Sequence, residues 1–284
     1  MPRLSTRQKV IIAQILNRII RLGRSIARKP MQGEFMRNGL RWHLDLNEGI
    51  DLAIYLLGAF ERDLVRCYER LIKPGDIVLD IGANIGAHTL PLARAVGATG
   101  KVVAIEATAY GVQKLQKNLA LNRDLEGRVA IAHSLLVSEG NTAKETHIYS
   151  RWPLAKAEAS HPVLAGSLEP IGNARICTLD QIVSELGLQH VNLMKLDVDG
   201  HELSVLHGAQ QLLEQHRPDI LMELAPYCYS EQPGGFDSLV ELLSKASYSF
   251  YLLDTTTRLP NTPEELAKNY IPKNGSINIL ARRT

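Results

Sequence analysis

From residue 77 onward, short apolar runs alternate with longer amphipathic segments, and this alternation limits the fold more than any other feature of the sequence. Apolar runs of this length are typical of strands buried on both faces of a parallel sheet. The segments between them have the period of helices. Strands and helices that alternate in this way predict an α/β fold with a doubly wound parallel sheet.

The expected elements follow directly from this pattern. Strands are predicted at residues 77–83, 101–107, 128–136, 191–200, 219–224, 248–254 and 277–283. Helices are predicted at residues 86–97, 108–121, 178–187, 201–216 and 236–246. The stretch from about 150 to 175 is rich in Pro, Ala and Ser. We expect it to be irregular and to form an insertion over the active face of the sheet.

A hairpin and a helix are predicted before the alternating region. Asn38-Gly39 is a hairpin turn signal, and Trp42, Leu44 and Leu46 alternate behind it. Residues 50–72 have the period of one continuous helix. We therefore expect three parts: an extension at 1–33, a hairpin-and-helix lead-in at 34–76 and the α/β domain at 77–284.

The extension at 1–33 is basic and amphipathic. Residues 5–28 predict one helix, in which Ile12, Ile15, Ile19, Leu22 and Ile26 share a stripe. Residues 1–33 contain no acidic residue and eight basic ones, which are Arg3, Arg7, Lys9, Arg18, Arg21, Arg24, Arg28 and Lys29. Three interpretations are open: the helix docks on the body or self-associates with a second subunit, lies on a membrane surface, or directs the chain to an organelle.

Composition excludes several classes of protein. Removing those eight basic residues from the 32 of the chain leaves 24 against 30 acidic ones, so the body has a formal charge of −6. With 5% aromatic residues, this argues against a nucleic-acid partner. No apolar run is long enough to span a membrane, and three scattered cysteines predict neither a disulfide framework nor a zinc site. We expect a cytoplasmic protein, peripheral at a membrane if residues 5–28 bind one.

The stretch VLDIGANIGAHTL, residues 78–90, joins a strand to a helix through a glycine turn. Ligands of doubly wound sheets bind at such turns. A nicotinamide dinucleotide usually requires G-x-G-x-x-G, but here the pattern is G-x-x-x-G with Asn84 at the middle position. Asp80 before the turn would face the anionic pyrophosphate. A cationic or zwitterionic ligand with an amino-acid end, such as S-adenosylmethionine, suits this turn better.

An acid at the end of the following strand adds to this evidence. Glu106 lies 20 residues after Gly86. An acid at that spacing is placed to accept hydrogen bonds from ribose hydroxyls. NAD-dependent enzymes share the feature, so Glu106 indicates an adenosine ligand without discriminating between the two cofactors.

These motifs, together with MKLDVDGHELSVLHGA at 194–209, resemble the FkbM family of S-adenosylmethionine-dependent methyltransferases. The resemblance covers about residues 38–225 and joins a D-x-G-A-N-x-G turn to a downstream K-x-D-V-[DE]-G-x-E. It implies a Rossmann-like class I methyltransferase fold of seven strands with the last antiparallel. It also implies O-methylation of a small-molecule acceptor, such as a sugar, glycolipid or natural product, through a hydroxyl. The basic extension lies outside the resemblance.

The resemblance also implies a cofactor site. Asp80, Gly82, Asn84 and Gly86 would line the methionine end, and Glu106 would hold the ribose. The adenine would meet Ser134 and Leu135, where this chain lacks the acid of many class I enzymes. The full expected set is Glu61, Asp80, Gly82, Asn84, Gly86, Thr89, Glu106, Ala107, Ser134 and Asp197.

Catalytic candidates follow the fourth strand of the α/β domain, in LDVDGHE. Asp197 and Asp199 share one side of the chain, and His201 titrates near neutral pH. We expect His201 to take the proton of the acceptor hydroxyl as the general base, with Asp199 and Asp197 as the other candidates. Asp197, Asp199 and Glu223 could alternatively hold Mg²⁺, but the spacing is not diagnostic and no metal ligand is assigned.

Two other functions remain as alternatives. One is a nicotinamide-dependent oxidoreductase, against which the missing middle glycine argues. The other is a non-catalytic binding protein that keeps the cofactor fold and is tethered by its basic helix. A protein that had lost its activity would be expected to lose Asp80 or a glycine of the turn first, and all of them are present.

Overall fold

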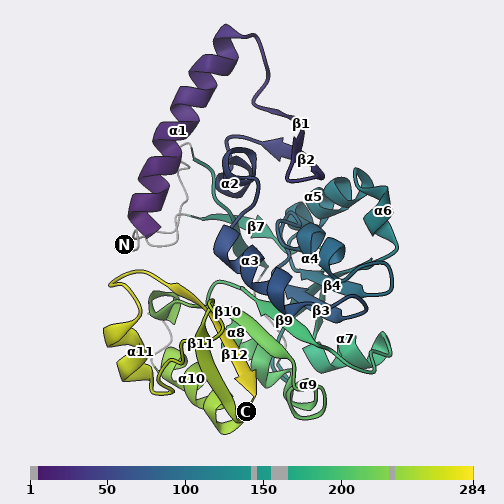
Figure 1. The fold of residues 1–284 in the computed structure, drawn as a ribbon, viewed down its shortest axis with the longest axis vertical. Helices are drawn as coiled ribbons and strands as arrows, with labels where there is room; N and C mark the ends of the chain where they lie inside the picture. Colours follow the sequence, from purple (N-terminus) through teal and green to yellow (C-terminus); the bar gives the residue numbers. More distant parts are fainter. Residues whose placement is uncertain (1–5, 142–145, 155–165, 230–233, 284) are drawn as a thin grey trace.

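The computed structural model describes residues 6–141, 146–154, 166–229 and 234–283, which are built around an eight-stranded sheet (Figure 1). The strand order is β11-β12-β10-β9-β3-β4-β5-β8. The strands are β3 (Ile77–Ile81), β4 (Lys101–Glu106), β5 (Val129–Leu136), β8 (Arg175–Cys177), β9 (Leu193–Leu196), β10 (Asp219–Leu224), β11 (Tyr248–Leu252) and β12 (Ile277–Arg283). β12 is antiparallel to β10 and β11, whereas the other neighbours are parallel. This confirms the predicted sheet and adds β8 at one edge.

Helices cover both faces of the sheet because successive residues of a buried strand point to opposite faces. Leu79 of β3 lies in one core with the helices α7 to α11, whereas its neighbour Val78 lies in a second core with the helices α2 to α6. The first group is α7 (Leu179–Glu185), α8 (Glu202–His207), α9 (Gln210–Gln215), α10 (Gly235–Lys245) and α11 (Pro263–Asn269). The second is α2 (Gly49–Leu57), α3 (Arg62–Leu71), α4 (Thr89–Ala95), α5 (Ala109–Ala120) and α6 (Arg123–Glu126).

The predicted hairpin of the lead-in is confirmed as β1 (Gln32–Arg37) and β2 (Leu40–Asp45). Asn38 and Gly39 both have positive φ, 49° and 74°, as a two-residue hairpin turn requires. Trp42 and Leu44 are fully buried in the second core. The lead-in therefore packs against the sheet rather than forming a core of its own.

The prediction of one helix over residues 50–72 is wrong, because the segment forms α2 and α3. Gly58 adopts a φ of 82° and ends α2, and Glu61 adopts a φ of 46° just before α3. A glycine in the left-handed conformation is a common helix terminator, and hydrophobic periodicity alone does not reveal it. The predicted helix at 201–216 is likewise two helices, α8 and α9. They part near Gly208, where an added Cβ would lie 2.3 Å from the Val137 carbonyl oxygen.

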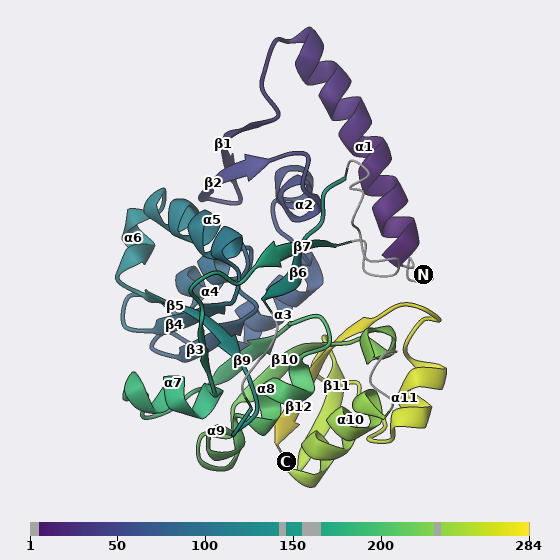
Figure 2. The ribbon, with the colours of Figure 1, turned by 180° about the vertical axis from the view of Figure 1, so that it is seen from behind.

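The basic extension forms the predicted helix, α1 (Thr6–Ile26), which lies beside α2 at the side of the molecule (Figure 2). The buried side chain of Asn17 donates a hydrogen bond of 2.6 Å to the Leu46 carbonyl. Arg21 donates one of 2.7 Å to Asn47 Oδ1. One face of the helix is therefore fixed to the lead-in.

The stretch we expected to be irregular holds three short strands. β6 (His147–Arg151) and β7 (Ser167–Pro170) form a separate antiparallel hairpin, and β8 extends the main sheet. These strands are three to five residues long and have no clear apolar alternation, so the pattern did not predict them. Residues 155–165, also within the expected insertion, lie outside the described part of the chain.

Candidate active site

The turn after β3 needs positive φ angles at three positions, and glycine or asparagine occupies each of them. Gly82, Asn84 and Gly86 have positive φ values of 75°, 47° and 86°. Glycine adopts this conformation freely, and asparagine tolerates it better than most residues. An added Cβ at Gly82 would lie 1.9 Å from the carbonyl oxygen of Asp197. Gly82 is thus required so that the turn can pack against the end of β9.

A buried ion network lies directly beneath this turn. Asp80 on β3 and Lys195 on β9 are opposite each other in the sheet register, and Nζ lies 3.6 Å from Asp80 Oδ1 and 3.3 Å from Asp197 Oδ2. Thr89 donates a 2.6 Å hydrogen bond to Asp80 Oδ2, whereas Oδ1 has no hydrogen-bond partner. Burial alone lowers the pKa of Lys195, but the carboxylates of Asp197, Asp80 and Glu61 raise it above its ordinary value. Lys195 therefore pairs with both Asp80 and Asp197.

Glu106 connects the ends of β3 and β4. One carboxylate oxygen accepts a 2.8 Å hydrogen bond from the Asn84 backbone N–H, and the other accepts one of 2.8 Å from the Thr108 N–H. The start of α5 approaches so closely that a Cβ on Gly111 would lie 2.8 Å from the Glu106 carboxylate carbon. Glu106 therefore fixes the turn in addition to any role toward a ligand.

The β6–β7 hairpin lies over the same turn. Asn84 Nδ2 donates a 2.8 Å hydrogen bond to the Ser150 carbonyl. Arg151 pairs with Glu48 of the lead-in and with Glu169 of β7. The expectation that an insertion covers the active face therefore agrees with the position of the hairpin.

Ala107 and Ser134 lie farther along the same edge of the sheet. The Ala107 carbonyl oxygen is 3.2 Å from His133 Nε2, and both Ala107 and Ser134 are buried. Ser134 is two residues before the end of β5 and pairs in register with Arg175 of β8. The added edge strand thus lies next to the position expected to meet adenine.

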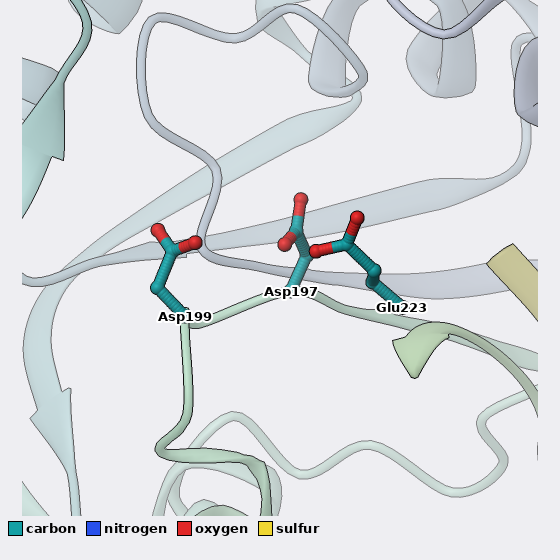
Figure 3. A group of neighbouring side chains, drawn as sticks. All are labelled: Asp197, Asp199 and Glu223. Carbon is teal, nitrogen blue, oxygen red and sulfur yellow. The ribbon is translucent and has the colours of Figure 1, made fainter. Parts of the chain in front are cut away.

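Three carboxylates converge at the ends of β9 and β10 (Figure 3). Asp197, Asp199 and Glu223 each offer an oxygen within 4.8 Å of the others, and all three residues are half-buried. Burial and the charge of Asp197 raise the pKa of Glu223 to about 8. The same two causes raise the pKa of Asp199 well above its usual range. A cation placed among these groups would relieve their repulsion.

Glu202 fixes the loop that carries Asp199. Its carboxylate accepts hydrogen bonds of 3.2 Å from the Val198 N–H and 3.1 Å from the Gly200 N–H, and one from the Tyr229 hydroxyl. Glu202 therefore binds the backbone amides of the turn that leads into α8. It also holds Asp199 at its positive φ of 48°.

Glu61 reaches the network from the lead-in. Its carboxylate accepts a 2.7 Å hydrogen bond from Asn278 on β12 and lies 3.4 Å from His88 Nε2. Burial alone would raise the pKa of Glu61, but His88, Asn278 and Lys195 lower it. His88 lies in the glycine-turn motif, where it could have been singled out. Asn278 is 217 residues from Glu61, and no local signal indicates it.

His201 is not part of the acidic cluster. It lines a separate hollow whose other residues come from the loop after β5, from the turn before α8 and from α8 itself. They are Ser138, Asn141, Gly200, Leu203, Ser204 and His207. None of the three clustered carboxylates lines this hollow. The structure therefore brings together Asp80, Thr89, Asp197 and Asp199, while His201 faces a different space.

A family model and two known proteins are similar to this chain in sequence. The family model described as "Methyltransferase FkbM domain" matches residues 80–250. The chain is 27% identical to the hexuronic acid methyltransferase AglP of Haloferax volcanii, over 66% of this chain and 71% of that protein. It is 26% identical to the AMB antimetabolite synthetase AmbE of Pseudomonas aeruginosa, over 72% of this chain. That alignment spans 11% of the synthetase.

The chain was also compared with solved structures. The crystal structure of methyltransferase FkbM from Methylobacillus flagellatus KT superposes with a TM-score of 0.44 at 20% identity. The superposition covers 74% of this chain and 44% of that one.

Proposed function

Because this chain belongs to the FkbM methyltransferase family, we propose that it transfers a methyl group from S-adenosylmethionine to a hydroxyl of a small-molecule acceptor. The observation that carries the proposal is the crowding of Asp197, Asp199 and Glu223 beside the glycine turn. Carboxylates with raised pKa values favour a positively charged ligand. The alternative nicotinamide cofactor would bring an anionic pyrophosphate to the same acidic edge.

The residues present fit this cofactor. When bound, it supplies a methyl group on a positively charged sulfur, together with an ammonium group. Asp197, whose side chain is 29% exposed, lies next to the turn, because its backbone carbonyl packs against Gly82. Glu106 would receive the ribose hydroxyls at the end of β4. Asp80 is fully buried, so its role in the proposal is to hold Lys195 and Thr89 in place.

The acceptor hydroxyl needs a base. We assign this role to Asp199 with Asp197, because their carboxylates converge beside the turn. A raised pKa makes Asp199 a stronger base than an ordinary aspartate. Its neighbour Glu223, with a pKa of about 8, is mostly protonated near neutral pH and can donate a hydrogen bond to the acceptor. His201, which the sequence favoured as the base, lines its own hollow and becomes the third candidate.

A divalent cation is the alternative occupant of the acidic cluster. Mg²⁺ prefers oxygen ligands, and three carboxylate oxygens are available within 4.8 Å of one another. Both occupants are cations, so the repulsion among the carboxylates does not distinguish them. Measuring the binding of S-adenosylmethionine with and without a chelator distinguishes the two occupants.

The proposal is tested by calorimetric binding of S-adenosylmethionine to the purified chain, with NADH as the comparison ligand. We expect micromolar binding of S-adenosylmethionine in the presence of EDTA, and none of NADH. Asp197→Asn should weaken the binding about tenfold or more, whereas Glu241→Gln, at an exposed position, should leave it unchanged. Thermal melting of both variants reports whether they fold.

Other results would favour the alternatives. Binding of NADH alone would favour an oxidoreductase, and binding of neither ligand would favour a non-catalytic protein. Binding that requires Mg²⁺ would place the metal in the site. An acceptor screen should begin with sugars that carry a uronic acid, because the relative AglP is named a hexuronic acid methyltransferase.

A further inference from the structure

Seven large apolar side chains of α1 are exposed, between 37% and 77%. They are Ile11, Ile12, Ile15, Leu16, Ile19, Leu22 and Ile26. Their spacing of three and four residues places them along one side of a 21-residue helix. Single exposed apolar residues are ordinary, but a continuous stripe of this size marks a surface that contacts something.

The stripe is not the face with which α1 docks on the body. Ala13 and Ile20 pack against the second core, and Asn17 between them is buried and bonded to Leu46. These three positions recur every three to four residues on the opposite side from Ile15, Ile19 and Leu22. Contact with the lead-in therefore fixes α1 and leaves the stripe exposed.

The charge around the stripe is of one sign. Residues 1–33 have eight basic side chains and no acidic one. Arg18 follows one flank of the stripe, and Arg28 and Lys29 follow its carboxyl end, whereas Arg21 is bonded to the lead-in. An anionic surface is complementary to this arrangement. A second copy of α1 would instead bring like charges together.

We propose that α1 lies on the surface of an anionic lipid bilayer, with its Ile and Leu stripe among the acyl chains and with Arg18, Arg28 and Lys29 at the headgroups. An amphipathic helix with a cationic polar side binds bilayers in this manner. No helix among the described residues is long and apolar enough to cross a membrane. The contact is therefore along the surface.

A chain of backbone and side-chain contacts connects this helix to the candidate active site. Asn17 and Arg21 bind the segment at 46–47, and the Leu154 N–H in turn donates to the Asn47 carbonyl at 2.8 Å. Leu154 follows β6, and the Ser150 carbonyl of β6 accepts the hydrogen bond from the Asn84 side chain. A bilayer bound at α1 would therefore lie on the side of the molecule where the hairpin covers the turn.

The test is co-sedimentation of the full chain with vesicles. One set contains phosphatidylcholine alone and the other contains equal parts of phosphatidylcholine and phosphatidylglycerol. We expect binding to the second set, weakening as salt is raised. The triple variant Ile15→Ser, Ile19→Ser and Leu22→Ser should lower the bound fraction about tenfold or more.

A matched control removes comparable apolar surface elsewhere. Leu57→Ser, Leu168→Ser and Ile176→Ser together alter residues that are 41–56% exposed outside α1, and this variant should bind as the unmodified chain does. Melting temperatures of both triple variants show that they fold. None of these measurements depends on methyl transfer, so the two proposals fail separately.

Two outcomes would overturn the inference. One is equal vesicle binding by the unmodified chain and the α1 variant. The other is a dimer in sedimentation velocity that the α1 substitutions dissociate, combined with no vesicle binding. The latter result would assign the stripe to a second copy of the chain.

Discussion

Lys195 and Asp80 form an ion pair between neighbouring strands, with Nζ 3.6 Å from Oδ1 and side chains that are 3% and 0% exposed. The same ammonium group also contacts Asp197 at 3.3 Å and the Gly82 carbonyl at 3.2 Å. The buried ammonium group of Lys195 thus connects Asp80, which is fully buried under the turn, to Asp197, which is partly exposed beside it.

Lys195→Met should destabilise the fold by about 3–5 kcal/mol, because it leaves Asp80 as a buried and unpaired charge. Lys245→Met is the matched control. It removes an exposed pair with Glu241 at 3.0 Å and should change the free energy of unfolding by less than about 0.5 kcal/mol. Urea denaturation followed by circular dichroism measures both.

The double variant Lys195→Met with Asp80→Asn separates charge from packing. It should recover part of the lost stability, since it removes the unpaired anion as well. A double variant less stable than Lys195→Met alone would show that Asp80 stabilises the fold without its partner.

Gly82→Ala should lower the free energy of unfolding by more than about 3 kcal/mol and abolish cofactor binding. The added Cβ would lie 1.9 Å from the Asp197 carbonyl oxygen, so the turn or β9 must shift. Gly140→Ala is the control for backbone conformation alone. Gly140 has a φ of 72° but open space around it, and its cost should be about 1 kcal/mol. Equal costs at the two positions would contradict the steric argument.

Asn118→Leu should destabilise the protein by about 2–3 kcal/mol. The Asn118 side chain is fully buried, accepts a 2.7 Å hydrogen bond from the His43 N–H and donates one of 2.9 Å to the Ile85 carbonyl. It therefore joins the lead-in hairpin to the glycine turn. Gln116→Leu, exposed on the same helix, should have little effect in the same denaturation experiment.

Stability should fall as pH rises through the titration of Glu223. Its pKa in the folded state is about 8 against an ordinary value of 4.5, so folding favours the protonated form. That stabilisation is complete below about pH 4.5 and is lost as pH rises through about 8. Between about pH 5 and pH 9, Glu223→Gln should gain about 1–3 kcal/mol relative to the unmodified chain. If the curves of unfolding free energy against pH for Glu223→Gln and the unmodified chain were parallel over this range, Glu223 would be ionised in the folded protein throughout it.

The sheet could be predicted because its signals are local. The central strands β3, β4, β9 and β10 are mostly apolar runs of four to six residues, and the Asn38-Gly39 sequence by itself indicates a hairpin turn. The β6–β7 hairpin could not be predicted in this way. Its strands are short and partly exposed, and they are held by contacts to Asn84 and Glu48 that are far away in the chain.

The site was predictable to the same extent. Asp80, Glu106 and Asp197 stand at strand ends, where the order of elements brings them to one edge of the sheet. His88, Asn278 and Ser276 complete the network through tertiary contacts, since they pair with Glu61 and Glu223 from distant elements. His201 lines a hollow together with the loop after β5, and periodicity does not predict this tertiary arrangement.

The position of β12 between β10 and β11 has a consequence for folding during synthesis. β11 emerges from the ribosome before β12, yet β12 is its only strand partner in the described sheet. β11 must therefore wait for residues 277–283 before it can pair. Asn278 and Ser276, which bind Glu61 and Glu223, arrive with the same late segment. The nascent chain can form the glycine turn early, but its acidic crevice is completed only when this final strand inserts.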